Sequence, residues 1–169
     1  MKAKLIVEGK EFPIEIHDPE LEKLLKPQKK TGYERVCKGS EYHFVDADDT
    51  INGYDEDLHN DVDDVYYENA NYYSDRTVAE NNARADKLMR QLRRFAVEHI
   101  ENNIDWKNVE QCKYYIVYDY NTNTLFHNYN QSYRGYGAIY FDSNKTAELA
   151  IKIFHDELIW YFTEYKDSL

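Results

Sequence analysis

The pattern of apolar and polar positions over residues 1–27 predicts a β-hairpin followed by a short helix. The run Lys4–Val7, apolar at positions 5–7, precedes Gly9, and the positions after it alternate between apolar and polar residues. Such alternation is typical of a strand with one buried face, and a glycine suits the turn. Asp18 offers a helix N-cap and Pro27 a helix end. The alternating apolar positions are Phe12, Ile14 and Ile16.

Two stretches further along the chain share a pattern and predict a repeated unit. Residues 70–75 and 138–143 lie 68 positions apart, and each is typical of a strand that leads into a helix N-cap. A strand pair is predicted before each stretch, at 42–45 and within 50–67, and again at 113–118 and 124–129. The predicted fold is therefore α+β: an N-terminal hairpin and helix (1–27), then two β-β-β-α units (28–104 and 105–169) that share one core.

The helices of the two units differ in character. The first, at about 77–100, has an apolar stripe on one side and basic residues on the other. The second, at about 145–165, is apolar around much of its circumference, so we expect it at the centre of the fold or in a homodimer interface. The first stripe is Ala85, Leu88, Leu92, Phe95 and Ala96, beside the basic residues Arg84, Lys87, Arg90, Arg93 and Arg94. The second stripe is Ala147, Ala150, Ile151, Phe154, Leu158, Tyr161 and Phe162, with Ile153 and Trp160 off it.

Charge changes this picture, because the net charge of −11 is concentrated in one segment. Between Lys38 and Arg76 the chain has twelve carboxylates and no lysine or arginine. Such a concentration attracts cations or basic surfaces. A solvated loop is the alternative. Tyrosines and aliphatic residues interrupt the segment, however, and disordered acidic tails contain few of these. We therefore expect a sheet that carries the carboxylates on its outer face.

These carboxylates are the candidate partner-binding residues. A pI near 5.0 opposes direct DNA binding, so the basic helix is expected to pair with the acidic segment of its own chain or of a second copy. Neutralising the six acids at 55–57, 61, 63 and 64 is expected to weaken partner binding and to leave folding intact. The candidates are Asp46, Asp48, Asp49, Asp55, Glu56, Asp57, Asp61, Asp63, Asp64 and Glu68.

A second candidate site comes from the aromatic residues of the second unit. Tyr133 and Tyr136 flank Arg134, and aromatic rings beside an arginine can stack on a nucleotide. Packing of aromatic residues on a thin sheet is the alternative interpretation.

Motifs for metal binding and catalysis are weak. Asp48 and the residues at 50, 52 and 53 match the opening of a calcium loop, but its twelfth position holds His59 in place of the required glutamate. Nucleophile-elbow, phosphate-loop and zinc-protease motifs do not occur in the sequence. We expect no metal, no cofactor and no enzymatic activity. Cys37 and Cys112 are expected to be free thiols, and the lack of a long apolar stretch favours the cytoplasm over a membrane.

Residues 30–36, 70–96 and 137–143 resemble small accessory proteins of phages and prophages of low-GC Gram-positive bacteria. The resemblance extends over about 28–169 and implies a phage protein that acts in the host cytoplasm. Small acidic proteins of this kind include anti-CRISPR proteins. The resemblance and the charge together lead us to expect an anti-defence protein whose acidic surface mimics DNA. The expected partner is the basic surface of a defence nuclease, in particular a type II CRISPR effector, or of its RNA complex. The alternatives are a sponge for a nucleotide immune signal and a structural phage accessory protein.

Overall fold

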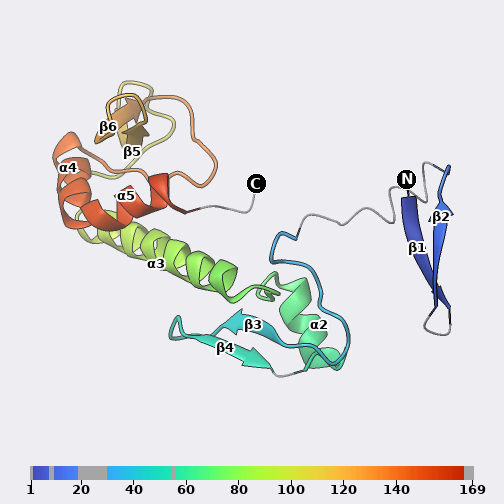
Figure 1. Cartoon of the computed structure of the whole chain (residues 1–169). Coiled ribbons are helices and arrows are strands. Elements are labelled where there is room, and N and C mark those ends of the chain that lie inside the picture. Colours follow the sequence, from blue (N-terminus) through green and yellow to red (C-terminus); the bar gives the residue numbers. More distant parts are fainter. Residues whose placement is uncertain (1, 8–9, 19–29, 55, 166–169) are drawn as a thin grey trace. The chain divides into compact units, whose positions relative to one another are not determined.

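The computed structural model describes residues 2–7, 10–18, 30–54 and 56–165 (Figure 1). The chain divides into two compact units, Met1–Thr31 and Gly32–Leu169, and each is described by itself. The first contains β1 (Lys2–Val7) and β2 (Lys10–Glu15), which pair antiparallel with Leu5 opposite Phe12. The N-terminal hairpin is thus confirmed. The short helix predicted after it lies largely outside the described residues.

The second unit combines helices and strands, which confirms an α+β fold. Its strands form two-stranded antiparallel sheets, β3 with β4 and β5 with β6. Both strand pairs occur where the sequence predicts them. The elements are β3 (Tyr42–Val45), β4 (Ile51–Tyr54), α2 (Asp61–Glu68), α3 (Arg76–Glu98), β5 (Lys113–Asp119), β6 (Thr124–Asn130), α4 (Asn144–Ile153) and α5 (His155–Thr163).

The predicted third strand of each unit is reduced to a single antiparallel bridge. Tyr73 exchanges two backbone hydrogen bonds of 2.9 Å with His43, and Phe141 exchanges bonds of 2.8 and 2.9 Å with Tyr114. Each stretch reaches the N-cap of a helix two residues later; the cap residue is still extended, and the helix begins at the next residue. Tyr73 and Phe141 are 68 positions apart, as are the N-caps Asp75 and Ser143. The predicted caps and the helices after them are confirmed. The prediction of a full third strand in each unit is wrong.

The acidic segment contains a helix where the sequence predicts only sheet. Asn60 caps α2: its side-chain oxygen accepts from the backbone N–H groups of Val62 at 2.8 Å and Asp63 at 3.1 Å. In return the Asp63 carboxylate accepts from the Asn60 N–H at 3.1 Å. This reciprocal pair is a capping box, which satisfies backbone donors at a helix start. Only 42–54 of this segment forms the expected hairpin.

Helix α3 supplies buried side chains to the second unit along much of its length. The helix is as predicted within two residues at each end, and the core stripe is confirmed, with Ala96 only partly buried. Ten of the buried residues form two separate hydrophobic clusters, whereas the sequence predicts one shared core. One cluster consists of Leu88, Leu92, Phe95, Phe141, Ala147, Ala150 and Leu158. The other consists of Tyr42, Phe44 and Tyr72.

The predicted second helix is divided at Phe154 into α4 and α5 (Figure 1). Phe154 has φ −104° and ψ 18°, outside the helical region. Because of this break, the side chains of α5 point in other directions than the apolar stripe of one continuous helix would give them. Trp160, predicted to lie off the stripe, is therefore buried, and Arg84 of α3 lies 3.9 Å above its ring. Leu158 is buried as predicted, but Phe154 is only partly buried.

Gly32 holds the start of the second unit against α3. It has φ 87°, and a Cβ there would lie 2.6 Å from Cγ2 of Val78. Gly39 has φ 85° with no atom within 4 Å of such a Cβ. We expect Gly32→Ala to lower the free energy of unfolding more than Gly39→Ala does, by at least about 1 kcal/mol, because only the first adds a clash to the backbone strain. Urea unfolding of both variants measures this difference, and equal losses would contradict it.

Candidate functional site: the acidic segment

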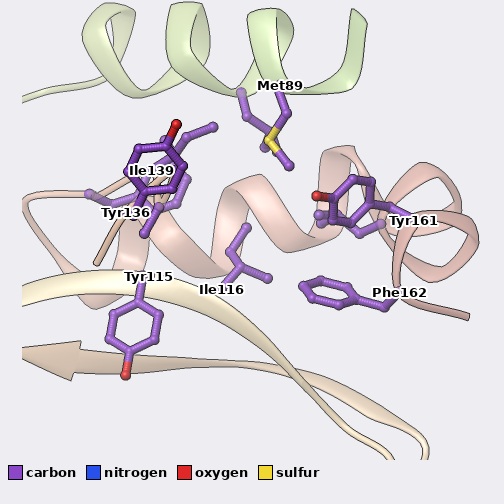
Figure 2. Close-up of a pocket in the computed structure, with 12 residues that line it drawn as sticks. Met89, Tyr115, Ile116, Tyr136, Ile139, Tyr161 and Phe162 are labelled. Atoms are coloured by element: carbon purple, nitrogen blue, oxygen red, sulfur yellow. The ribbon is translucent and has the colours of Figure 1, made fainter. Parts of the chain in front are cut away.

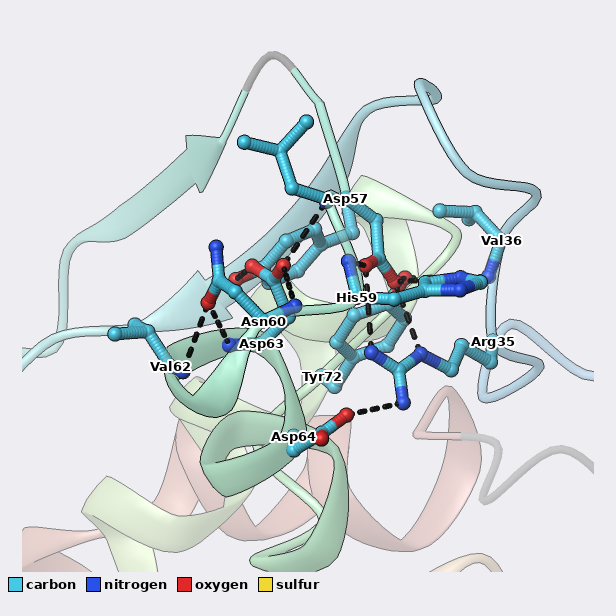
Figure 3. A network of polar contacts seen from close by, with 11 residues as sticks. Arg35, Val36, Asp57, His59, Asn60, Val62, Asp63, Asp64 and Tyr72 are labelled. Carbon is cyan, nitrogen blue, oxygen red and sulfur yellow. Dashed lines mark hydrogen bonds and ion pairs between the residues drawn. The ribbon is translucent and has the colours of Figure 1, made fainter.

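Part of the acidic segment folds around one arginine (Figure 3). The Arg35 guanidinium donates to both oxygens of Asp57, from Nε at 3.1 Å and from Nη2 at 3.3 Å. Its Nη1 donates to Asp64 at 2.5 Å. Asp57 is completely buried, so this bidentate pair is shielded from solvent on the carboxylate side. Arg35 lies before the acidic run in sequence and is the cationic partner of two of its carboxylates, Asp57 and Asp64.

The buried carboxylates also accept from tyrosine hydroxyls. The rings of Tyr42 and Tyr72 stack with their centroids 4.1 Å apart in the smaller core cluster. Tyr72 donates its hydroxyl to Asp57 at 2.8 Å, and Tyr42 donates to Asp63 at 2.9 Å. A buried hydroxyl without a partner is costly. A core built from tyrosines therefore needs buried acceptors, and Asp57 and Asp63 supply them.

These contacts set the protonation of the network. Burial by itself raises the pKa of Asp57, but the hydrogen bonds from Arg35, Tyr72 and the His59 backbone outweigh it and hold the pKa well below its ordinary value. Burial, with the hydrogen bond to Asp57, raises the pKa of Tyr72 above its ordinary value. Asp57 is thus an ionised acceptor and Tyr72 a protonated donor at neutral pH.

Four of the candidate acids therefore have partners within the fold. Asp57 and Asp63 are buried, so assigning them to a partner-binding surface is wrong. Asp64 is half-buried and neutralised by Arg35. Asp49, in the β3–β4 turn, forms ion pairs with Lys87 and Arg90 of α3. This last contact confirms that the basic helix pairs with the acidic segment of its own chain.

The remaining candidates that the structure describes are exposed. Asp46 and Asp48 accept hydrogen bonds within the β3–β4 turn, and Asp55 lies outside the described residues. Glu56, Asp61 and Glu68 are exposed on and beside α2. Their carboxylates have no cationic partner in the described part of the chain.

Exposed apolar side chains lie among these carboxylates. Leu58, Val62 and Val65 are 51%, 52% and 55% exposed. Positions 61, 62, 65 and 68 lie on one side of a helix of 3.6 residues per turn, opposite the buried Asp63. The outer face of α2 thus presents aliphatic and acidic groups together. We use the name α2 face for six exposed residues on and just before this helix: Glu56, Leu58, Asp61, Val62, Val65 and Glu68.

The second candidate site does not assemble as a stack of its three residues. Tyr133 is 76% exposed and Tyr136 fully exposed, whereas the Arg134 guanidinium carbon lies 5.7 Å from the ring centroid of Trp106. Tyr136 stands instead beside an apolar cavity of about 210 Å³, lined by α3, β5 and α5 (Figure 2). Met89 and Ile116 line the same cavity.

The described residues contain no group of three or more histidine, cysteine, aspartate or glutamate side chains placed to hold a metal ion. The carboxylate of Asp48, which begins the calcium-loop match, accepts from the Thr50 backbone at 3.0 Å and hydroxyl at 2.6 Å, and so closes a turn. Cys37 and Cys112 are free thiols. Within the described ranges, no helix has the length and apolarity that a membrane span requires.

Comparison with known proteins identifies no relative: the chain matches no family model, no curated protein and no solved structure.

Proposed function

We propose that this chain is a phage-encoded anti-defence protein whose α2 face binds a basic surface of a nucleic-acid-processing bacterial effector. The observation that supports this is the concentration of exposed carboxylates and exposed aliphatic side chains on one short helix and in the residues just before it. Isolated exposed apolar residues are ordinary, but a group of them within one charged patch is typical of an interaction surface. The phage setting rests on the resemblance described for residues 28–169.

The charge of this face determines the kind of partner. Glu56, Asp61 and Glu68 carry negative charge, and the whole chain has a net charge of −11. Enzymes that hold DNA or a guide–target duplex meet its phosphates with lysine and arginine. The α2 face can occupy those side chains and exclude DNA. The aliphatic residues add a contact that a phosphate backbone lacks, so the partner surface must combine cations with apolar groups. A type II CRISPR nuclease loaded with its guide RNA is the partner that we propose.

Binding kinetics on a guide-loaded type II nuclease test this proposal. We expect Glu56→Gln/Asp61→Asn/Glu68→Gln to slow association, because charge steers encounter. Added salt should weaken wild-type binding as the Debye length falls from about 10 Å at 0.1 M to about 3 Å at 1 M. Val62→Ser/Val65→Ser should instead speed dissociation, because it removes contacts made only in the complex.

The matched control is Glu101→Gln/Glu110→Gln/Glu164→Gln, which removes three exposed carboxylates outside the α2 face. This control should retain wild-type kinetics apart from a small effect of net charge. If it binds as poorly as the α2 triple variant, only total charge matters and the face is wrongly assigned. If the wild-type protein does not bind the loaded nuclease, the proposed partner is wrong.

A further inference from the structure

Two arginines differ from the other five in their partners. Within the described residues, five arginines each contact a carboxylate: Arg35, Arg76, Arg84, Arg90 and Arg94. Arg93 and Arg134 have no carboxylate partner in that part of the chain. They are 41 positions apart in sequence, and both line the same hollow. In a chain with 32 acidic residues, such pairing is the normal state of an arginine, so two unpaired ones at one place indicate a site for an external anion.

The hollow has an apolar floor and an aromatic wall. It measures about 290 Å³ and lies between the C-terminal part of α3 and the segments around 104–106 and 134–140. Ala96 and Ile139 contribute apolar surface, and Trp106 and Tyr140 contribute rings that meet edge to face with centroids 4.8 Å apart. Small-molecule sites are typically about 300–1,000 Å³, with apolar walls and a few placed polar groups. At about 290 Å³ this hollow is just below that range and suits a single small ligand.

A third cation lies close to the indole. Lys113 is completely buried at the start of β5, and its Nζ lies 5.5 Å from the ring centroid of Trp106. The ammonium donates to the backbone carbonyls of Asn108 at 2.6 Å and Gln131 at 2.8 Å. These carbonyls satisfy its hydrogen bonds but leave its charge uncompensated. Asp105, which precedes Trp106 in sequence, accepts from the backbone N–H of Lys107 at 2.9 Å. Two cationic side chains, Lys113 and Arg134, thus lie within 6 Å of the Trp106 ring centroid.

From this arrangement we infer a binding site for a nucleoside phosphate, with the base against Trp106 and Tyr140 and the phosphates held by Arg93 and Arg134. Aromatic side chains stack on bases of any sequence. Arginine forks match phosphate oxygens with paired hydrogen bonds. A ring and an anion in one small ligand satisfy both features of the hollow. This inference does not depend on the α2 face or on its partner.

Isothermal titration calorimetry of the full chain with three probes tests the site. ADP carries ring and phosphates, adenosine only the ring portion, and pyrophosphate only the phosphates. We expect ADP to bind at least about tenfold more tightly than either part, because stacking and charge-assisted hydrogen bonds each contribute. If pyrophosphate binds as tightly as ADP, the hollow is only a positive patch and the inference is wrong. Absence of ADP binding at millimolar concentration also overturns it.

Substitutions locate the binding. Arg93→Gln and Arg134→Gln should each weaken ADP binding at least about tenfold, since each removes a charged hydrogen-bond donor. The matched control is Arg94→Gln, which alters the adjacent exposed arginine that pairs with Glu98; it should change affinity less than about twofold. These arginines are exposed, so the variants are expected to fold, and their thermal unfolding can be checked directly. Equal losses in Arg93→Gln and Arg94→Gln would show that the hollow is not the site.

Discussion

Asp57→Ala is expected to lower the free energy of unfolding by on the order of 3 kcal/mol at neutral pH. The substitution leaves the Tyr72 hydroxyl buried without its acceptor and removes the bidentate partner of Arg35. Breaking a buried pair on one side costs more than the pair contributes, because the remaining groups keep their desolvation penalty. Urea unfolding at neutral pH measures the loss. Glu56→Ala is the matched control, since it removes the adjacent but exposed carboxylate.

The pH dependence of this loss identifies its cause. The pKa of Asp57 is depressed in the folded protein, so its stabilisation is complete above the unfolded-state pKa of about 3.9. It is lost as pH falls below that value, through the folded-state pKa. The difference in stability between wild type and Asp57→Ala should therefore shrink as pH is lowered from about 5 to about 2. A difference that stays constant over this range would show that lost packing, and not the ionised carboxylate, accounts for the effect.

The same network corrects an expectation about the acidic segment. Charge counting suggests that neutralising the six acids at 55–57, 61, 63 and 64 leaves folding intact. The structure gives Asp57, Asp63 and Asp64 internal partners, so that variant removes core hydrogen bonds together with surface charge. Only substitutions confined to the α2 face separate binding from folding. Net charge describes the field around a segment, but it does not distinguish a buried carboxylate from an exposed one.

The sequence predicts the local elements of the fold but not the contacts between residues far apart in the chain. Asn60 followed three positions later by the acidic Asp63 is compatible with a capping box, but the same spacing occurs at Asp46 and Asp49 in a turn, so it does not by itself predict α2. Local sequence patterns with a period of two to four residues predict the strand pairs and the long amphipathic helix. Local patterns also predict both helix caps. The contacts of Arg35 with Asp57 and Asp64 span 22 and 29 positions. No local pattern specifies such a pairing in a segment with twelve carboxylates.

The hollow around Trp106 shows the same limit. Proximity in sequence predicts a site at Tyr133, Arg134 and Tyr136, yet only Arg134 of these three lines the hollow. Its companions Arg93 and Tyr140 come from α3 and from the stretch before α4. Their approach depends on the bridge between Tyr114 and Phe141, which fixes that stretch beside β5. A site assembled through one isolated bridge leaves no periodic signal in the sequence.

Phe141→Ala is expected to cost about 3–5 kcal/mol of unfolding free energy. The side chain is 1% exposed and belongs to the larger core cluster, with its ring centroid 6.4 Å from that of Phe95. It also lines the apolar cavity of about 210 Å³, so truncation enlarges an existing void. Surrounding side chains cannot easily fill such a space, and the cost of a core truncation rises with the volume that stays empty.

The control for this substitution is Phe126→Ala, which removes the same side chain from β6 at a position 43% exposed. Its loss should be at most about 1 kcal/mol, because less apolar area returns to water and no cavity forms. Urea unfolding of both variants gives the comparison. The backbone bridge to Tyr114 does not involve the phenyl ring, so the strand pair β5–β6 should persist in Phe141→Ala and hydrogen exchange should still protect it. Losses of similar size in the two variants would place the core of this unit elsewhere.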